Sequence, residues 1–307
     1  MHILITGGAG FIGSNIAFAI QEKFPHARIF ILDNFSSGHF KNLIGFRGQV
    51  ITGDISDPNL WNYLRNNFSF DVIFHQAAIT DTTVSDQELM MRVNSDSMRY
   101  ILDSALEWGA KVIYASSAGV YGNTDPPMQE DRGLEPENIY GFSKLMMDRI
   151  AMYYEQKHSP DLKVVGLRYF NVYGPGESYK GKSASMIYQL AVKMMHGQKP
   201  RIFKWGDQRR DFVYIKDVVR ANLLAMEKDV TGIFNIATGE ARSFNEIIKI
   251  INEELGTDLE TEYFDCPYDF YQEFTMADIS KAKEALGYSP QFRLEDGIRD
   301  YLRRIRA

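Results

Sequence analysis

Short apolar runs alternate with longer helical patterns through the first half of the chain. The apolar runs span residues 2–6, 28–32, 49–52, 71–75, 111–116 and 163–168, and the helical patterns lie near 11–23, 57–67, 86–108 and 138–158. The runs are hydrophobic throughout instead of strictly alternating, which is typical of parallel strands covered by helices on both faces. The pattern therefore predicts an α/β fold built on a Rossmann-type, doubly wound parallel sheet.

The regular alternation ends near residue 170. A stretch rich in glycine and lysine, YGPGESYKGKSAS, then precedes a helical pattern at 184–196, and short mixed elements follow. The sequence contains no low-complexity linker and no internal repeat. We therefore expect one large domain over residues 1–170, to which later segments return, and a smaller mixed α/β lobe over residues 171–307.

Three glycines stand three residues apart where the first apolar run meets the first helical pattern, in the stretch GGAGFIG. Gly7 would permit the tight turn, Gly10 would keep a side chain out of the ligand's path, and Gly13 would let the helix lie close to the sheet. A glycine-rich turn at a helix start exposes backbone N–H groups to a pyrophosphate. The first domain is therefore predicted to bind a dinucleotide, and the second lobe to bind mainly the substrate.

Polar residues at the ends of the next two strands bear on the kind of dinucleotide. Asp33 lies about 20 residues past the last glycine, where a carboxylate accepts from the ribose hydroxyls of NAD and repels the 2′-phosphate of NADP. Asn34, His39 and Lys41 follow and could hold that phosphate if Asp33 turned away. The choice between NAD and NADP stays open, and Asp54 is a candidate contact to the adenine.

A tyrosine and a lysine form the candidate catalytic pair. The stretch YGFSK places Tyr140 and Lys144 four residues apart near a helix start, so both lie on one face of the helix. Ser116 and Ser117 end the strand that comes before it. A lysine ammonium beside a phenol lowers the pKa of the phenol, which could then exchange a proton near neutral pH.

Composition limits the class of partner. The net charge of -6 and the pI near 5.6 argue against nucleic acid or an anionic membrane as the main partner. The single cysteine, Cys266, excludes an internal disulfide, and no metal site is expected. No apolar run approaches the roughly 20 residues of a membrane span, and no signal pattern opens the chain, so we expect a cytoplasmic protein.

The motifs TGGAGFIG and YGFSK, with a serine one strand earlier, resemble the extended short-chain dehydrogenase/reductase superfamily. The resemblance implies a tightly held nicotinamide cofactor, with Ser116, Tyr140 and Lys144 as the proton-handling group. Most close relatives in that superfamily act on nucleotide-activated sugars. Fold and cofactor alone do not name the reaction.

Four longer stretches resemble one particular family within that superfamily. HQAAITDTTVSDQELMMRVNSDS, RYFNVYGPGESYKGKSASM, RRDFVYIKDV and FYQEFTMADIS are similar to the ADP-heptose 6-epimerase family, over nearly the whole chain. This implies an isomerase of lipopolysaccharide core biosynthesis that inverts C6 of the heptose in ADP-D-glycero-D-manno-heptose by transient oxidation. It also implies that Lys180 is a second base opposite Tyr140, that the subunits form a homo-oligomer, and that NADP is slightly favoured. The alternative is another nucleotide-sugar 4-epimerase, dehydratase or heptose dehydrogenase of the same fold.

The motifs and the resemblance together give the expected binding residues. Arg210 has an independent case among them, because a guanidinium grips a diphosphate with two parallel hydrogen bonds. The cofactor is expected to contact Gly7, Gly10, Phe11, Ile12, Gly13, Asp33, Asn34, His39, Lys41, Asp54, Gln76, Ala77, Ala78, Asn94, Tyr140, Lys144, Val172 and Lys180. The sugar nucleotide is expected to contact Ser117, Asn171, Lys182, Gln189, Phe203, Lys204, Trp205, Gly206, Arg210 and Tyr271.

Overall fold

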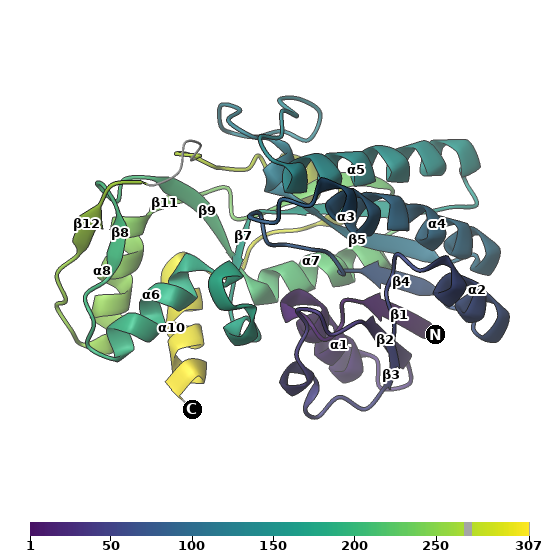
Figure 1. Cartoon of the computed structure of the whole chain (residues 1–307), viewed down its shortest axis with the longest axis horizontal. Helices are drawn as coiled ribbons and strands as arrows, with labels where there is room; N and C mark the ends of the chain where they lie inside the picture. Colours follow the sequence, from purple (N-terminus) through teal and green to yellow (C-terminus); the bar gives the residue numbers. More distant parts are fainter. Residues whose placement is uncertain (267–271, 307) are drawn as a thin grey trace.

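Seven parallel strands form the central sheet of the computed structural model, which describes residues 1–266 and 272–306 (Figure 1). The strands lie in the order β10-β6-β5-β4-β1-β2-β3, and every pair of neighbours is parallel. The predicted doubly wound sheet is confirmed. Its strands are β1 (His2–Thr6), β2 (Arg28–Asp33), β3 (Gln49–Thr52), β4 (Val72–His75), β5 (Lys111–Ser117), β6 (Val164–Tyr169) and β10 (Gly232–Ile236).

Helices cover both faces of this sheet because successive strand residues point to opposite sides. Leu4 packs in a core with Trp61 and Met147, whereas its neighbour Ile3 packs in another core with Ile16 and Val218. Each fully buried aliphatic side chain of this kind contributes roughly 1.5–3 kcal/mol. The helices of the first core are α2 (Pro58–Asn67), α4 (Ser97–Trp108) and α5 (Ile139–His158), and those of the second include α1 (Phe11–Lys23) and α7 (Ile215–Glu227).

The helical pattern predicted over 86–108 is divided by one wide turn. Helix α3 (Gln87–Met91) leads into a π-helical segment, η2 (Arg92–Asp96), before α4 begins. The turn carries the buried Asn94, whose Nδ2 donates to the carbonyl of Ile79 (2.9 Å) and whose Oδ1 accepts from the N–H of Ile79 (2.8 Å). The predicted helical segment is confirmed, but the sequence did not signal its π turn, which directs the Asn94 amide at the loop after β4.

The remaining strands form two small sheets of a smaller lobe, on the left of Figure 1, and later segments return to the main sheet. One three-stranded sheet has the order β11-β9-β7, and β12 pairs with β8. The chain then comes back through α7 to β10, which pairs with β6. The elements not yet given are β7 (Asn171–Tyr173), β8 (Arg201–Phe203), β9 (Arg209–Tyr214), β11 (Ala241–Ser243), β12 (Glu262–Phe264), α6 (Met186–Met195), α8 (Phe244–Leu255), α9 (Ser280–Leu286), α10 (Leu294–Arg306), η1 (Phe40–Leu43), η3 (Ala118–Val120) and η4 (Ser178–Ser183).

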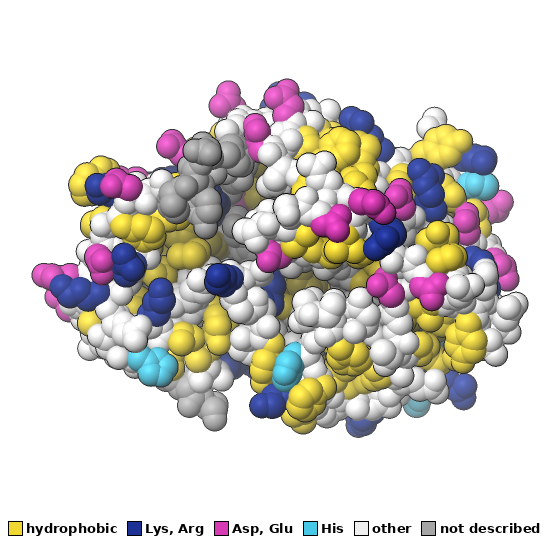
Figure 2. All heavy atoms as spheres, in the orientation of Figure 1, with side chains coloured by type: hydrophobic (Ala, Val, Ile, Leu, Met, Phe, Trp, Pro, Cys, Tyr) yellow, Lys and Arg dark blue, Asp and Glu magenta, His cyan; other side chains and the backbone are white. Residues whose placement is uncertain are grey.

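The order of the strands fixes where a ligand can bind. β1 has β2 on one side and β4 on the other, so the winding of the sheet reverses between β1 and β4. Ligands of doubly wound sheets bind beyond the carboxyl ends of the strands at such a point. The space-filling view shows a hollow between the two lobes, with positive and negative side chains interspersed over this face (Figure 2).

Among the described residues, no helix has the length and apolar character needed to cross a bilayer. Among the same residues, no group of three His, Cys, Asp or Glu side chains is placed to hold a metal ion.

Candidate active site

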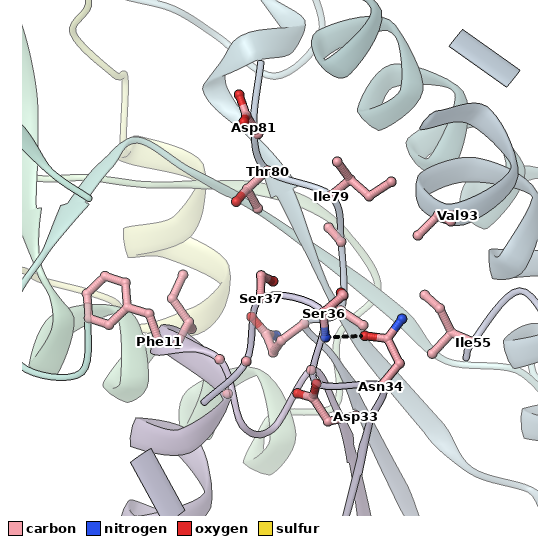
Figure 3. A pocket seen from close by; sticks show the side chains of 18 of the residues that line it. Phe11, Asp33, Asn34, Ser36, Ser37, Ile55, Ile79, Thr80, Asp81 and Val93 are labelled. Atoms are coloured by element: carbon pink, nitrogen blue, oxygen red, sulfur yellow. Dashed lines mark hydrogen bonds between the residues drawn. The ribbon is translucent and has the colours of Figure 1, made fainter. Parts of the chain in front are cut away.

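A pocket of about 570 Å³ opens at the point where the winding reverses (Figure 3). Its walls come from the turn between β1 and α1, from the segments after β2, β3 and β4, and from η4. Twelve of the residues predicted to bind the cofactor line it: Gly7, Gly10, Phe11, Ile12, Gly13, Asp33, Asn34, Asp54, Gln76, Ala77, Ala78 and Lys180.

The glycine turn packs so closely on neighbouring backbone that side chains would collide there. A Cβ on Gly7 (φ 67°) would lie 2.5 Å from the Ala77 nitrogen, and a Cβ on Gly13 would lie 2.3 Å from the Gly7 carbonyl oxygen. Helix α1 begins after Gly10 with no side-chain cap and no acidic residue in its first turn. Its first N–H groups therefore lack a side-chain partner and present the positive end of the helix dipole to the pocket. These residues fit a dinucleotide.

An apolar slot lies beside this turn. The side chains of Ile55, Ile79 and Val93 point into the same space as Asn34 (Figure 3). Three aliphatic groups around a gap suit the flat face of an adenine. None of the three was predicted from the sequence. Ile55 and Ile79 directly follow predicted contacts and could have been found from that, whereas Val93 is brought here by the π turn, which the sequence did not signal.

Asp33 turns its carboxylate toward the backbone of the glycine turn. Its Oδ2 accepts from the N–H of Ala9 (2.9 Å) and its Oδ1 accepts from the N–H of Phe35 (2.8 Å). Burial raises the pKa of Asp33, and the two backbone hydrogen bonds partly offset that rise. Neither His39 nor Lys41 is among the residues that line the pocket, and Lys41 is exposed.

Tyr140 lies in the first turn of α5, where the N–H of Gly141 donates to the Asn138 side chain (2.8 Å). Its side chain is hydrogen-bonded to Ser117. Burial raises the pKa of Tyr140, and the hydrogen bond with Ser117 lowers it in part. The neighbouring Ser116 is buried, and its Oγ has no hydrogen-bond partner among the described residues. The structure therefore joins the tyrosine to Ser117 and not to Ser116.

Lys144 is almost fully enclosed, with 2% of its surface exposed. Its Nζ donates to the carbonyl of Ala115 at 2.8 Å. Burial lowers the pKa of Lys144 to about 8, and the charge of Asp148 opposes that change. The expected lowering of the Tyr140 pKa by this ammonium is not found, because burial has the larger effect on the phenol. The sequence predicted that the two residues share a helix face but not how strongly the interior desolvates both.

Asn94 connects the pocket to α5. Its Nδ2 also donates to Ser143 Oγ (3.2 Å), while its other hydrogen bonds hold the pocket residue Ile79. Asn171 and Val172 lie on β7, exposed and half-buried respectively, and neither is among the lining residues. Asn94 therefore helps to shape the pocket by holding Ile79 in place, whereas Asn171 and Val172 do not line it.

Lys180 lines the dinucleotide pocket with its side chain half-buried. Its Nζ lies 5.6 Å from the centre of the Phe11 ring. Burial lowers the pKa of Lys180, and Glu177 opposes this. The next residue, Gly181, has φ 57° and ψ −125°, a backbone conformation that is essentially restricted to glycine. The glycine that follows Lys180 in the sequence is therefore explained by the backbone conformation at that position.

Most of the residues predicted to bind the sugar nucleotide lie in the segments from η4 to β9, and none of the described ones is among the residues that line the dinucleotide pocket. Arg210 is 7% exposed and donates to the Arg209 carbonyl (2.9 Å). Gln189 donates to the carbonyl of Ala184 (2.8 Å), and Lys182 is exposed. Four residues form one stretch from β8 into the following turn: Phe203, Lys204, Trp205 and Gly206. Tyr271 lies outside the described residues.

Comparison with known proteins agrees with this geometry. A curated ADP-L-glycero-D-manno-heptose-6-epimerase from Brachyspira hyodysenteriae is 37% identical over 97% of this chain and 96% of its own length. The crystal structure of the Helicobacter pylori ADP-L-glycero-D-manno-heptose-6-epimerase matches with a TM-score of 0.93 and 49% identity, covering 100% of this chain and 96% of that one. The Thermotoga maritima UDP-glucose 4-epimerase, solved with UDP-glucose, matches with a TM-score of 0.92 and 32% identity, covering 100% and 99%.

A family model covers most of the chain as well. Residues 3–237 match the model described as the NAD dependent epimerase/dehydratase family. That range includes the glycine turn, Tyr140 and Lys180, and it ends just after β10. The chain belongs to the NAD-dependent epimerase/dehydratase family.

Proposed function

We propose that the chain is an ADP-L-glycero-D-manno-heptose 6-epimerase. It would invert C6 of the heptose in ADP-D-glycero-D-manno-heptose to give ADP-L-glycero-D-manno-heptose. Two heptose 6-epimerases from different organisms match this chain over nearly its full length at 37% and 49% identity, whereas the UDP-glucose 4-epimerase matches at 32%, which supports the heptose substrate over other nucleotide sugars. The residues of the glycine turn would hold a nicotinamide cofactor, which would supply the hydride chemistry of the reaction.

The reaction needs a proton-handling group on each side of C6, one acting as base and the other as acid. Oxidation of the C6 alcohol breaks its C6–H and O–H bonds: the proton passes to the base, the hydride acceptor would be the nicotinamide, and a ketone remains. Hydride returned to the opposite face of the ketone inverts the centre, and the oxygen takes a proton from an acid on that side. We assign Tyr140 to one side and Lys180 to the other, with Ser117 orienting the phenol.

The feature that carries the assignment is the position of Lys180. Its amine lines the dinucleotide pocket beside Phe11 instead of extending into solvent. Burial lowers the pKa of Lys180, so the amine releases its proton more readily than an exposed lysine would. A base at this place, distant in sequence from Tyr140, supports an inversion that uses two acid–base groups.

We propose NADP as the natural form of the cofactor. Both carboxylate oxygens of Asp33 accept from backbone amides, at Ala9 and at Phe35, so the carboxylate is held against the glycine turn. Asn34, Ser36 and Ser37 line the pocket next to it. Hydroxyl and amide groups of this kind can donate to a 2′-phosphate. Mass spectrometry of the nucleotide released on denaturation distinguishes NADP from NAD.

The substrate assignment is tested by incubating the purified holoenzyme with ADP-D-glycero-D-manno-heptose and following C6 by NMR. UDP-glucose serves as the control, because a 4-epimerase of the same fold would convert it. We expect inversion at C6 of the heptose with no change in UDP-glucose. Unchanged C6 configuration would refute the proposal, and net accumulation of reduced cofactor would indicate a dehydrogenase instead.

A further inference from the structure

The loop that carries Lys180, residues 174–185, is closed at its base by one buried carboxylate. We call this loop the strap. Glu177 is completely buried and accepts from the N–H of Gly174 (3.0 Å) and from Ser185 Oγ (2.9 Å). The two ends of the strap are therefore tied to the same side chain. The middle of the strap, with Lys180, is left to be positioned by other contacts.

Two asparagines dock the strap on the first strand–helix unit. Asn15 Nδ2 donates to the carbonyl of Pro175 (2.8 Å). Asn42 Nδ2 lies within hydrogen-bond distance of two carbonyls, that of Gly176 in the strap (3.2 Å) and that of Ala9 in the glycine turn (3.1 Å). The strap and the glycine turn are thus linked through a shared donor, on the N-terminal side of Lys180.

The residue just before Lys180 makes a ring contact with the loop after β2. The rings of Tyr179 and His39 are stacked, with centroids 3.9 Å apart and planes 5° apart. His39 is itself fixed, because its N–H donates to the Ala9 carbonyl (3.0 Å) and its Nδ1 accepts from the N–H of Lys41 (3.2 Å). Tyr179 therefore rests on a ring whose position is set by the glycine turn.

Packing of the protein core does not explain this stack. Tyr179 is 42% exposed and belongs to none of the hydrophobic cores of the described residues. Its loss should leave the global fold almost unchanged. The backbone of Lys180, however, lies between the stacked Tyr179 and the turn at Gly181. Loss of the stack would therefore free this backbone on one side and let the amine of Lys180 change position.

We infer that the His39–Tyr179 stack is a positioning device that holds Lys180 over the dinucleotide pocket. His39 and Tyr179 are positioning residues, and the inference rests on the proposed function in giving Lys180 its role as a base. The stack also joins the segment after β2, which lines the pocket through residues 36–38, to the strap. Release of a nicotinamide dinucleotide from under the strap should therefore become faster when the stack is broken.

The test compares Tyr179→Leu with Tyr179→Phe, which keeps the ring. Each purified holoenzyme is treated briefly with an amine-acetylating reagent, and modification of Lys180 relative to the exposed Lys182 is measured by peptide mass spectrometry. Because an aromatic stack contributes a modest free energy, we expect Tyr179→Leu to raise this ratio by roughly threefold to tenfold. Tyr179→Phe should match the wild type, and both variants should keep the wild-type melting temperature.

Two further measurements accompany the labelling. Dissociation of the bound dinucleotide, followed by filtration, should accelerate by a similar factor in Tyr179→Leu, and kcat should fall while KM for the sugar nucleotide is unchanged. His39→Leu should likewise raise the Lys180 to Lys182 ratio, and the double variant should not raise it further, because the stack is already lost in either single variant. An unchanged Lys180 to Lys182 ratio in Tyr179→Leu would overturn the inference. A wild-type protein that leaves C6 unchanged would refute the proposed function instead, and the labelling does not depend on that outcome.

Discussion

Tyr140 is hydrogen-bonded to Ser117, the last residue of β5, while the adjacent Ser116 points its hydroxyl into the interior without a partner among the described residues. Successive residues of a strand face opposite sides, so only one of two neighbouring serines can reach the tyrosine. The serine that orients the phenol is therefore Ser117 in our proposal. Ser116 was the serine expected from the sequence.

This relationship predicts different outcomes for two alanine substitutions. Ser117→Ala should lower kcat by about tenfold to a hundredfold, because a misplaced acid–base group loses its alignment with the reacting atoms. Ser116→Ala should keep near wild-type kcat, since it removes a hydroxyl that has no hydrogen-bond partner among the described residues. Steady-state turnover of both variants, with circular dichroism to verify folding, provides the measurement. The reverse order of effects would return the role to Ser116.

The buried ammonium of Lys144 should make stability depend on pH. Burial lowers the pKa of Lys144 from 10.5 to about 8, so between these values the unfolded chain binds the proton more strongly than the folded one. Stability attributable to this group therefore rises with pH from 8 to 10.5, by about 3 kcal/mol in total. Asp148 faces Lys144 and is paired with Arg168 (2.9 Å), and His75, whose pKa is lowered to about 3, is uncharged in this range.

Lys144→Met isolates this contribution. Denaturant unfolding of the wild type and the variant at several pH values between about 7 and 10 gives the difference in free energy of unfolding. We expect that difference, wild type minus variant, to increase steadily above pH 8. A difference that does not vary with pH would show that Lys144 titrates as it does in the unfolded chain.

Asp33 should contribute about equally to the binding of NAD and of NADP. Its two oxygens hold the backbone at Ala9 and Phe35, and an asparagine side chain at this position would offer only one acceptor to these two donors. The distorted glycine turn should then bind NAD and NADP more weakly by a similar factor, roughly tenfold, because one buried hydrogen bond is lost. Fluorescence titration of Asp33→Asn with NADH and NADPH measures this. A loss for NADH alone would mean that Asp33 acts mainly on the ribose hydroxyls.

The main sheet and the dinucleotide pocket could be predicted because both depend on local patterns. Apolar runs and helical periodicity placed the six strands from β1 to β6, and the glycine spacing placed the pocket at the end of β1. The features that escaped prediction depend on contacts between distant segments. The π turn at η2 is explained by Asn94 reaching Ile79, and the stack of His39 on Tyr179 joins two loops that no periodicity connects. Burial, which raises the pKa of Tyr140 against expectation, is likewise a property of the folded interior.

In our proposal, Tyr140 and Lys180 handle protons on opposite sides of one sugar carbon. It is tested most directly by measuring the turnover of ADP-D-glycero-D-manno-heptose with Tyr140→Phe and Lys180→Met, each loaded with cofactor and shown to be folded. Both variants should lose at least about a hundredfold in kcat, the range expected for removal of a general acid–base group. Near-normal turnover in either variant would remove that residue from the mechanism and contradict the account.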